Sequence, residues 1–307
     1  MAASLERTEY FYGSENALQN VAVWEFPKDQ VEEAPLGKTK YWLIFLHGGA
    51  WRDPRATFNE AEPTINALLD PSHPAHIPHP SSRIAAFASI NYRLSPHPEY
   101  VQDEASTPSF ARRAARHPDH LVDALSGLRF LQHKFGGSAA PASRYVLFGH
   151  SAGGFLGYQV LVREAARDRF ADLAPPTAVV GFEGIYDLVG LNGRMEGNYT
   201  GFMEAAFGPD EGGGWARASP ATTAGQSFGA WGGAGAGRLA VLAHSPGDEL
   251  VDMADCDAME ARLKADGVAN VKVYRDLKGG HFEVLGDGSF ARVLKETLEE
   301  LESMEKA

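Results

Sequence analysis

Cysteine is almost absent from this chain of 307 residues, in which Cys256 is the only one. A single thiol excludes an intramolecular disulfide, and the sequence holds no Cys/His zinc pattern. Apolar runs are short, and none approaches the roughly 18 residues that a membrane span needs. The first 16 residues are polar and lack the apolar core of a signal peptide. We therefore expect a soluble protein of the cytoplasm.

Positive charge is also scarce. Lysine and arginine number 28 against 40 aspartates and glutamates, so the formal net charge is −12. An acidic chain without a basic cluster is a poor partner for nucleic acid or for an anionic membrane. We expect neither partner. Hydrophobic residues make up 44% of the chain, which is ample material for a large core.

The stretch Arg144–Gly154 carries the strongest motif. A short run of aromatic and β-branched residues leads into Gly149-His150-Ser151-Ala152-Gly153, and we expect a helix from Ala152 to about Arg169 after it. This is G-x-S-x-G between strand and helix, the arrangement called a nucleophile elbow. The turn is too tight for Cβ atoms beside the serine, and it presents Oγ at a helix N-terminus that stabilises negative charge. Ser151 is therefore the predicted nucleophile.

Further strand patterns alternate with helical ones, which indicates a mainly parallel sheet with helices on both faces. We predict one α/β domain, with a glycine-rich cap or lid inserted at about residues 189–237. Ligand sites in such sheets lie beyond the carboxyl ends of the strands. The predicted strands are Gln19–Phe26 (an antiparallel edge strand), Tyr41–Leu46, Ile84–Tyr92, Tyr145–Phe148, Thr177–Ile185, Arg238–Ala243 and Val271–Tyr274.

A serine hydroxyl needs a base, and the imidazole of that base needs an acid to hold its tautomer. In the elbow fold the chain order is serine, acid, histidine. Asp248 follows a predicted strand in a Pro-Gly turn, and His281 is the only histidine after it. We predict Asp248 as the acid and His281 as the base. Asp187, which follows the preceding strand, is the rival acid.

The sequence His47-Gly48-Gly49-Ala50-Trp51 also follows a predicted strand. Backbone N–H groups that approach a tetrahedral oxygen form an oxyanion hole, and glycines permit that approach. We assign the donors to Gly48, Gly49 and Ala152. His47 is expected to brace the turn, whereas Trp51 either lines the substrate pocket or packs in the core.

Three histidines, His73, His76 and His79, recur at every third position among prolines. In a polyproline II helix they would share one edge, where a metal could bind. A solvated loop is the simpler interpretation, and we expect no metal and no cofactor.

Together these motifs resemble the α/β-hydrolase superfamily in its hormone-sensitive-lipase-like branch, and more closely the fungal kynurenine formamidases (arylformamidases). The resemblance implies an α/β-hydrolase fold and hydrolysis of N-formyl-L-kynurenine to L-kynurenine and formate in tryptophan catabolism. It implies the triad Ser151, Asp248 and His281 and no cofactor. The matching segments are HGGAW at 47–51, NYRLSP at 91–96, GHSAGG at 149–154, GIYDL at 184–188, HSPGDELV at 244–251 and GGHFEVL at 279–285.

Two other functions stay open at this point. Related esterases share the HGG and G-x-S-A-G-G motifs, so a carboxylesterase for short-acyl esters is the first alternative. A non-catalytic ligand receptor on a hydrolase fold is the second, although such proteins usually lose a triad member. The oligomeric state is open as well, with a homodimer as one candidate.

Overall fold

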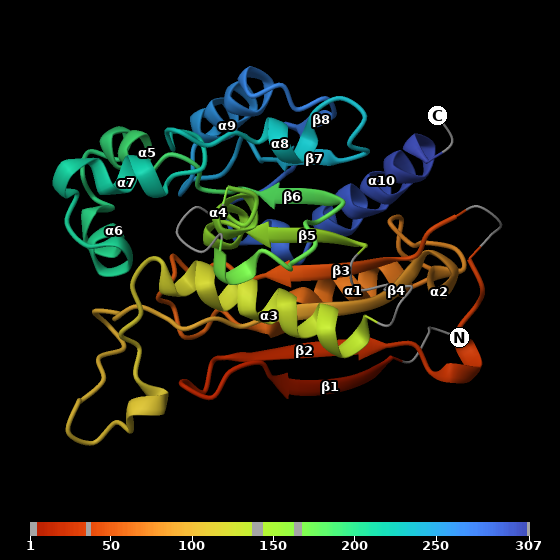
Figure 1. Ribbon diagram of the computed structural model, residues 1–307, viewed down its shortest axis with the longest axis horizontal. Helices are drawn as coiled ribbons and strands as arrows, with labels where there is room; N and C mark the ends of the chain where they lie inside the picture. The colour runs from red at the N-terminus through yellow and green to blue at the C-terminus, as the bar shows by residue number, and fades with distance from the viewer. Residues whose placement is uncertain (1–4, 35–37, 137–143, 163–167, 306–307) are drawn as a thin grey trace.

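An eight-stranded sheet forms the centre of the protein (Figure 1). The computed structural model describes residues 5–34, 38–136, 144–162 and 168–305. The strand order is β1-β2-β4-β3-β5-β6-β7-β8. Strand β2 pairs antiparallel with both β1 and β4, and the remaining pairs, from β4 across to β8, are parallel. The strands are β1 Glu6–Phe11, β2 Asn20–Glu25, β3 Tyr41–Leu46, β4 Ile84–Ile90, β5 Tyr145–His150, β6 Ala178–Phe182, β7 Leu239–Ala243 and β8 Val271–Tyr274.

Helices cover both faces of the sheet. Helices α3, α4 and α9 pack on one face, and α1 and α10 pack on the other. None of the described helices combines the length and apolar character needed to cross a bilayer. The helices are α1 Glu62–Leu69, α2 Pro80–Arg83, α3 Asp119–Phe135, α4 Ala152–Gln159, α5 Leu188–Arg194, α6 Thr200–Phe207, α7 Gly214–Ala218, α8 Gly229–Gly232, α9 Met253–Ala265 and α10 Ser289–Met304.

Strand β3 shows why the sheet is sandwiched. Its side chains alternate between the two hydrophobic cores: Ile44 packs on the side of α3 and α4, and Phe45 on the side of α1 and α10. All six residues of the strand are buried. A strand covered on both faces has no polar face to show, and for this reason its sequence is continuously apolar.

The prediction for the sheet edge was wrong by one strand. β2 was expected at the edge, yet it pairs with β1 on one side and β4 on the other. The edge strand is β1, five of whose six residues are exposed. Its polar sequence carries no apolar alternation, because neither face of β1 is buried as the inner strands are.

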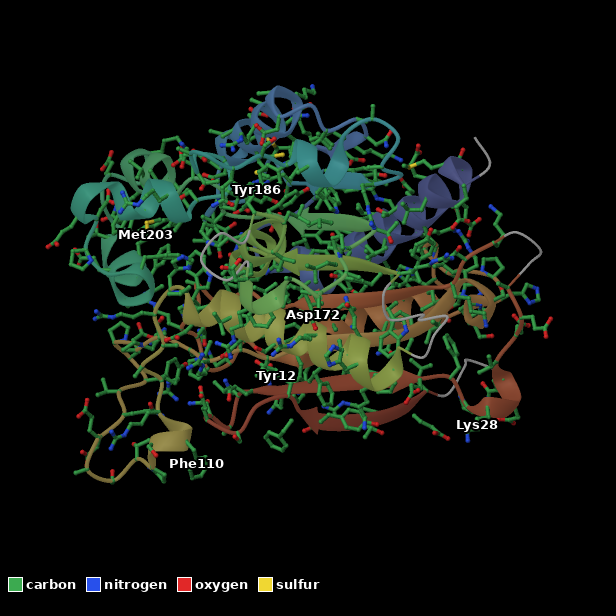
Figure 2. All side chains as sticks on the ribbon, in the orientation of Figure 1. Tyr12, Lys28, Phe110, Asp172, Tyr186 and Met203 are labelled. Atoms are coloured by element: carbon green, nitrogen blue, oxygen red, sulfur yellow. The ribbon has the colours of Figure 1, made fainter. Side chains whose placement is uncertain are left out.

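The parallel strands β3 to β7 all end at the same edge, and α5, α6 and α7 lie together beyond it (Figure 1). Met203 on α6 and Tyr186 just before α5 are both buried within this region (Figure 2). Helix α8 lies elsewhere, because the indole N–H of Trp231 donates to the carbonyl of Pro176, shortly before β6. The predicted cap segment, residues 189–237, therefore lies in two places: α5, α6 and α7 are beyond the strand ends, and α8 is near the start of β6.

Candidate active site

Ser151 lies in a strained turn between β5 and α4. Its backbone angles are φ 53° and ψ −118°, a combination that non-glycine residues seldom adopt. The backbone is held on both sides: the Ser151 N–H donates to the carbonyl of Phe182, and the Ser151 carbonyl accepts from Phe155. Among the described residues the hydroxyl makes no hydrogen bond, and 5% of the residue is exposed. The turn thus leaves Oγ without a competing partner.

The flanking glycines are required by close backbone contacts. A Cβ atom on Gly149 would lie 2.3 Å from the backbone of Gly153. A Cβ atom on Gly153 would lie 2.0 Å from the carbonyl oxygen of Leu46, at the end of β3. Both positions exclude a side chain without movement of the backbone, so the motif follows from the packing of α4 against β3 and β5.

The structure brings two of the predicted triad residues into direct contact. The Nδ1–H of His281 donates to Oδ2 of Asp248 at 2.8 Å, and both side chains are almost fully buried, at 3% and 0% exposed. The other carboxylate oxygen of Asp248 accepts the N–H groups of Leu250 and Val251. The aspartate is therefore fixed by its own turn while it orients the imidazole.

Two residues without a predicted role hold the loop that carries His281 beside the elbow. His150, the neighbour of Ser151, donates from Nε2 to the carbonyl of His281 at 2.9 Å, and the two rings are 4.5 Å apart. Burial keeps the pKa of His150 well below its usual value, so the ring is neutral. Glu249 accepts the His281 N–H at 3.1 Å. These contacts place the imidazole next to the residue that precedes the serine.

The HGGAW turn lies against the same elbow. A Cβ atom on Gly48 would lie 3.3 Å from Cβ of Ser151, so no side chain separates the two. Gly49 adopts φ +85° and its carbonyl accepts the N–H groups of Arg52 and Asp53, which closes the turn. Ala152 is the first residue of α4, where an N–H has no partner within the helix.

The side chains of His47 and Tyr92 hold the HGGAW turn in place. The two rings stack at 4.2 Å, and the Tyr92 hydroxyl donates to the carbonyls of His47 and Gly48. Nδ1 of His47 donates to the Gly48 carbonyl at 3.0 Å, and burial lowers the pKa of His47 to about 4. A neutral, hydrogen-bonded ring of this kind holds backbone in place.

Glu60 is a buried carboxyl beside the same turn. Burial raises its pKa to about 7, and the Gly48 amide partly offsets this increase. The Gly48 N–H therefore faces the carboxyl of Glu60 in this structure. The amides of Gly49 and Ala152 are the donors that face no such acid.

Trp51 is fully buried. Its ring packs edge to face on Phe155 and Phe207, with centroids 5.1 and 4.8 Å apart, and it also contacts Phe202. Of the two expectations for Trp51, this geometry supports core packing between α4 and α6.

The rival acid lies in a different environment. Asp187 caps α5 by accepting the N–H of Gly190. Asp255 on α9 is 0% exposed and accepts the N–H groups of Tyr186 and Asp187. Burial raises its pKa to about 7. Both carboxylates support the start of α5.

Two of the three loop histidines make separate side-chain contacts, and Nδ1 of His76 has no hydrogen-bond partner among the described residues. His73 accepts the N–H of Ala75, and His79 pairs with Glu32 at 3.0 Å. Among the described residues, the one group of three side chains that could hold an ion together lies elsewhere and consists of His150, Glu183 and His281.

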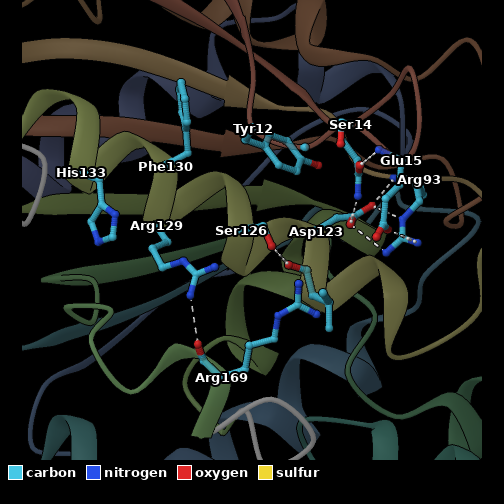
Figure 3. A pocket seen from close by; sticks show the side chains of 13 residues that line it. Tyr12, Ser14, Glu15, Arg93, Asp123, Ser126, Arg129, Phe130, His133 and Arg169 are labelled. Carbon is cyan, nitrogen blue, oxygen red and sulfur yellow. Dashed lines mark hydrogen bonds and ion pairs between the residues drawn. The ribbon is translucent and has the colours of Figure 1, made fainter. Parts of the chain in front are cut away.

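A cavity of about 360 Å³ lies between α3 and the residues that join β1 to β2 (Figure 3). None of the predicted triad residues lines it. At its wall Asp123 is fully buried and forms a two-pronged pair with Arg93, at 2.8 and 2.9 Å. The amide of Gln19 also donates to Asp123. Asp123 thereby ties α3 to the segment after β4 through Arg93 and to the start of β2 through Gln19.

The chain is similar in sequence to several characterised proteins. It is 38% identical to a kynurenine formamidase-like hydrolase of Fusarium equiseti over 88% of this chain and 86% of that protein. It is 33% identical to a kynurenine formamidase of Aspergillus versicolor, over 80% and 84% of the two chains. A kynurenine formamidase of Meyerozyma guilliermondii is 27% identical, over 83% of each. No protein-family model matches the chain.

Solved structures with the same fold include esterases. Esterase B of Lactobacillus rhamnosis superposes with a TM-score of 0.66 at 16% identity, over 98% of this chain and 86% of that one. A truncated carbohydrate esterase from gut microbiota gives a TM-score of 0.64 at 15% identity, over 98% of both chains. The predicted α/β-hydrolase fold is thereby confirmed. On sequence identity over most of its length, the chain belongs to the kynurenine formamidase family.

Proposed function

We propose that this protein hydrolyses the formyl amide of N-formyl-L-kynurenine to L-kynurenine and formate, a step of tryptophan catabolism. One observation carries the proposal: in a chain of this family, His281 bonded to Asp248 contacts His150, the residue that precedes the elbow serine. The small-molecule substrate follows from the relatives' names.

The first half of the reaction uses the free nitrogen of His281. Because Nδ1 donates to Asp248, Nε2 carries the lone pair and accepts the Ser151 proton while Oγ attacks the formyl carbon. In this proposal the Gly48 amide turns from Glu60 to the oxyanion, which it stabilises together with the amides of Gly49 and Ala152. The hydrogen bond between the Ser151 hydroxyl and the His281 imidazole forms when substrate binds, since catalytic hydrogen bonds of unliganded enzymes are often long and shorten only in the complex.

The second half releases both products. His281 protonates the leaving aryl amine, and water then cleaves the formyl-serine to give formate. An aryl amine leaves more readily than an alkyl amine, so an esterase-like site suffices for this amide. Asp248 stays ionised throughout and stabilises the imidazolium that forms.

Substitution of Ser151 by alanine tests the catalytic role. We expect kcat to fall by about 10⁴-fold or more, while binding of N-formyl-L-kynurenine measured by calorimetry is retained. Unchanged turnover would reject the elbow as the nucleophile. Binding of N-formyl-L-kynurenine by the unaltered protein without any turnover would instead favour a receptor role.

A carboxylesterase is the second candidate, favoured by the esterases that share the fold. Comparison of kcat/KM for N-formyl-L-kynurenine and for p-nitrophenyl acetate separates the two. Efficient turnover of the ester alone would remove the formamidase proposal and leave the hydrolase chemistry intact.

The proposal also covers the cap, the cellular location and the oligomeric state. Helices α5, α6 and α7 act as the cap of a single hydrolase domain, a role supported by their place beyond the strand ends (Figure 1). The protein acts in the cytoplasm without nucleic acid or membrane as partner, which cell fractionation tests. A homodimer is tested by sedimentation.

A further inference from the structure

Glu183 is a buried carboxyl at the active site for which the proposed mechanism has no use. It follows β6 directly, between the elbow and the Asp248 loop, and it is 0% exposed. Its φ is +47°, a left-handed conformation that non-glycine residues seldom adopt. The backbone is held there by the bond from the Glu183 N–H to the carbonyl of Ala243. Such strain is concentrated at functional sites.

The carboxyl of Glu183 points at the two active-site imidazoles. Oε2 lies 3.5 Å from Nδ1 of His281 and 3.6 Å from Nε2 of His150. Neither carboxyl oxygen makes a well-formed hydrogen bond with the described residues. His150 is already committed to the carbonyl of residue 281. The Nδ1–H of His281 is therefore the donor nearest to Glu183 that could be shared.

The charges around Glu183 keep it neutral. Burial, followed by the negative charge of Asp248, raises the pKa of Glu183 to about 9, and Glu249 and Asp287 add to this. The Ser245 amide lowers it in part. His244, 3.5 Å from Asp248, and His150 both have a lowered pKa and bring no positive charge.

We propose that Glu183 is a positioning residue for the His281 imidazole, a second carboxyl that accepts the Nδ1 hydrogen bond when Asp248 cannot. The inference rests on the proposed role of His281 as general base. A shift of about 0.5 Å brings the 3.5 Å contact to hydrogen-bond distance. Removal of Asp248 also removes a charge that opposes ionisation of Glu183. Loss of the Asp248 carboxylate thus favours the ionised form of Glu183, which is the stronger hydrogen-bond acceptor.

In the intact site the neutral carboxyl has a second consequence. Two ionised carboxylates at one imidazole would favour its protonated form and remove the base. A protonated Glu183 fills the space beside Nδ1 and leaves Asp248 as the single charge there. The His281 imidazole therefore lies between the carboxyls of Asp248 and Glu183, of which only that of Asp248 is charged.

A double-mutant cycle tests the proposal, with Asp248→Ala, Glu183→Gln and the double variant. We expect about a 100-fold loss of kcat for Asp248→Ala, against the roughly 10⁴-fold typical of a lost triad acid. Glu183→Gln should cost about threefold in the wild-type background and about 100-fold beside Asp248→Ala, a coupling within the range of contacting residues. Equal factors in both backgrounds would overturn the proposal.

The matched control is Asp255→Asn, which alters another fully buried carboxyl near the end of β6. Its effect on kcat should be the same factor in both backgrounds. If it couples to Asp248 as strongly as Glu183→Gln does, the coupling reflects general loosening and the proposal fails. Should Asp248→Ala not fold, Asp248→Ser keeps a short oxygen acceptor for the Leu250 and Val251 amides and serves in the same cycle.

Proton NMR provides a readout that needs no substrate. In Asp248→Ala the downfield signal of the Nδ1 proton of His281 should persist, and it should move upfield in the double variant, where a neutral amide oxygen replaces the carboxylate as acceptor. Its absence from Asp248→Ala would contradict the proposal. The cycle is run with p-nitrophenyl acetate as well as N-formyl-L-kynurenine, so failure of the amide alone would reject the proposed function without touching this inference.

Discussion

Replacement of Gly153 by alanine should damage both the stability and the chemistry of the protein. The new Cβ would lie 2.0 Å from the Leu46 carbonyl oxygen and 2.6 Å from that of His47, where real contacts stay beyond 3.0 Å. Neither obstacle is the end of a flexible side chain. Relief therefore requires α4 to move away from β3, or the HGGAW turn to shift.

Overpacking of a core costs about 1–3 kcal/mol when side chains can adjust, and more when they cannot. Because both obstacles here are backbone, we expect Gly153→Ala to lower the free energy of unfolding by at least about 3 kcal/mol, or roughly 6 °C in Tm. A displaced turn also misplaces an oxyanion donor, which typically costs about 10²–10³-fold in kcat.

Gly157 provides the matched control, one turn later in the same helix. Its Cβ would lie 3.5 Å from Cγ1 of Val179, an ordinary contact. Alanine there should be neutral or gain up to about 1 kcal/mol from helix propensity. Urea unfolding and ester hydrolysis of both variants measure the effects. If Gly153→Ala matched Gly157→Ala in stability and kcat, the packing argument for the elbow would be refuted.

Three further predictions concern buried groups. The folded-state pKa of Glu183 is raised above the unfolded value of about 4.5, so the stability that it contributes is lost as pH rises toward about 9. Urea titrations should show wild type losing up to about 1.4 kcal/mol of unfolding free energy per pH unit relative to Glu183→Gln in that window. Parallel curves for the two proteins would contradict the raised pKa. Asp123→Ala leaves Arg93 without its buried partner and should cost about 3–5 kcal/mol by urea unfolding, whereas a loss below about 1 kcal/mol would show that the pair adds little. Trp51→Ala should cost about 3–5 kcal/mol with little change in KM, and a large rise in KM with unchanged Tm would restore the pocket-lining alternative.

Much of the fold and several site residues could be read from local patterns. The run at 41–46 predicted β3 because a strand buried on both faces must be apolar throughout. The elbow was recognisable because its tight turn restricts which residues fit. Helix α4 was predicted to run to Arg169, yet it ends at Gln159. There the amides of Leu161 and Val162 turn to carbonyls three residues back, which tightens and ends the helix.

Glu183 and His150 carried no usable signal. A glutamate after a strand is ordinary in a sequence, and only the sheet order, with β6 between β5 and β7, sets this one beside His281. His150 was visible inside the G-x-S-x-G motif, but its bond to the carbonyl of residue 281 spans 131 positions. A spacing of this length leaves no pattern in neighbouring residues.

The sequence by itself determined which residues can react and which local turns can form, because backbone sterics and side-chain chemistry act over a few positions. It named a serine in a glycine turn, a histidine and an aspartate after strands, and a glycine pair beside a third strand. Only the tertiary structure decided which of these groups meet. The pairing of Asp248 with His281, the direction of the Gly48 amide and the burial of Glu183 all depend on how β3, β5, β6 and β7 align at one edge, and that alignment is set by long-range packing.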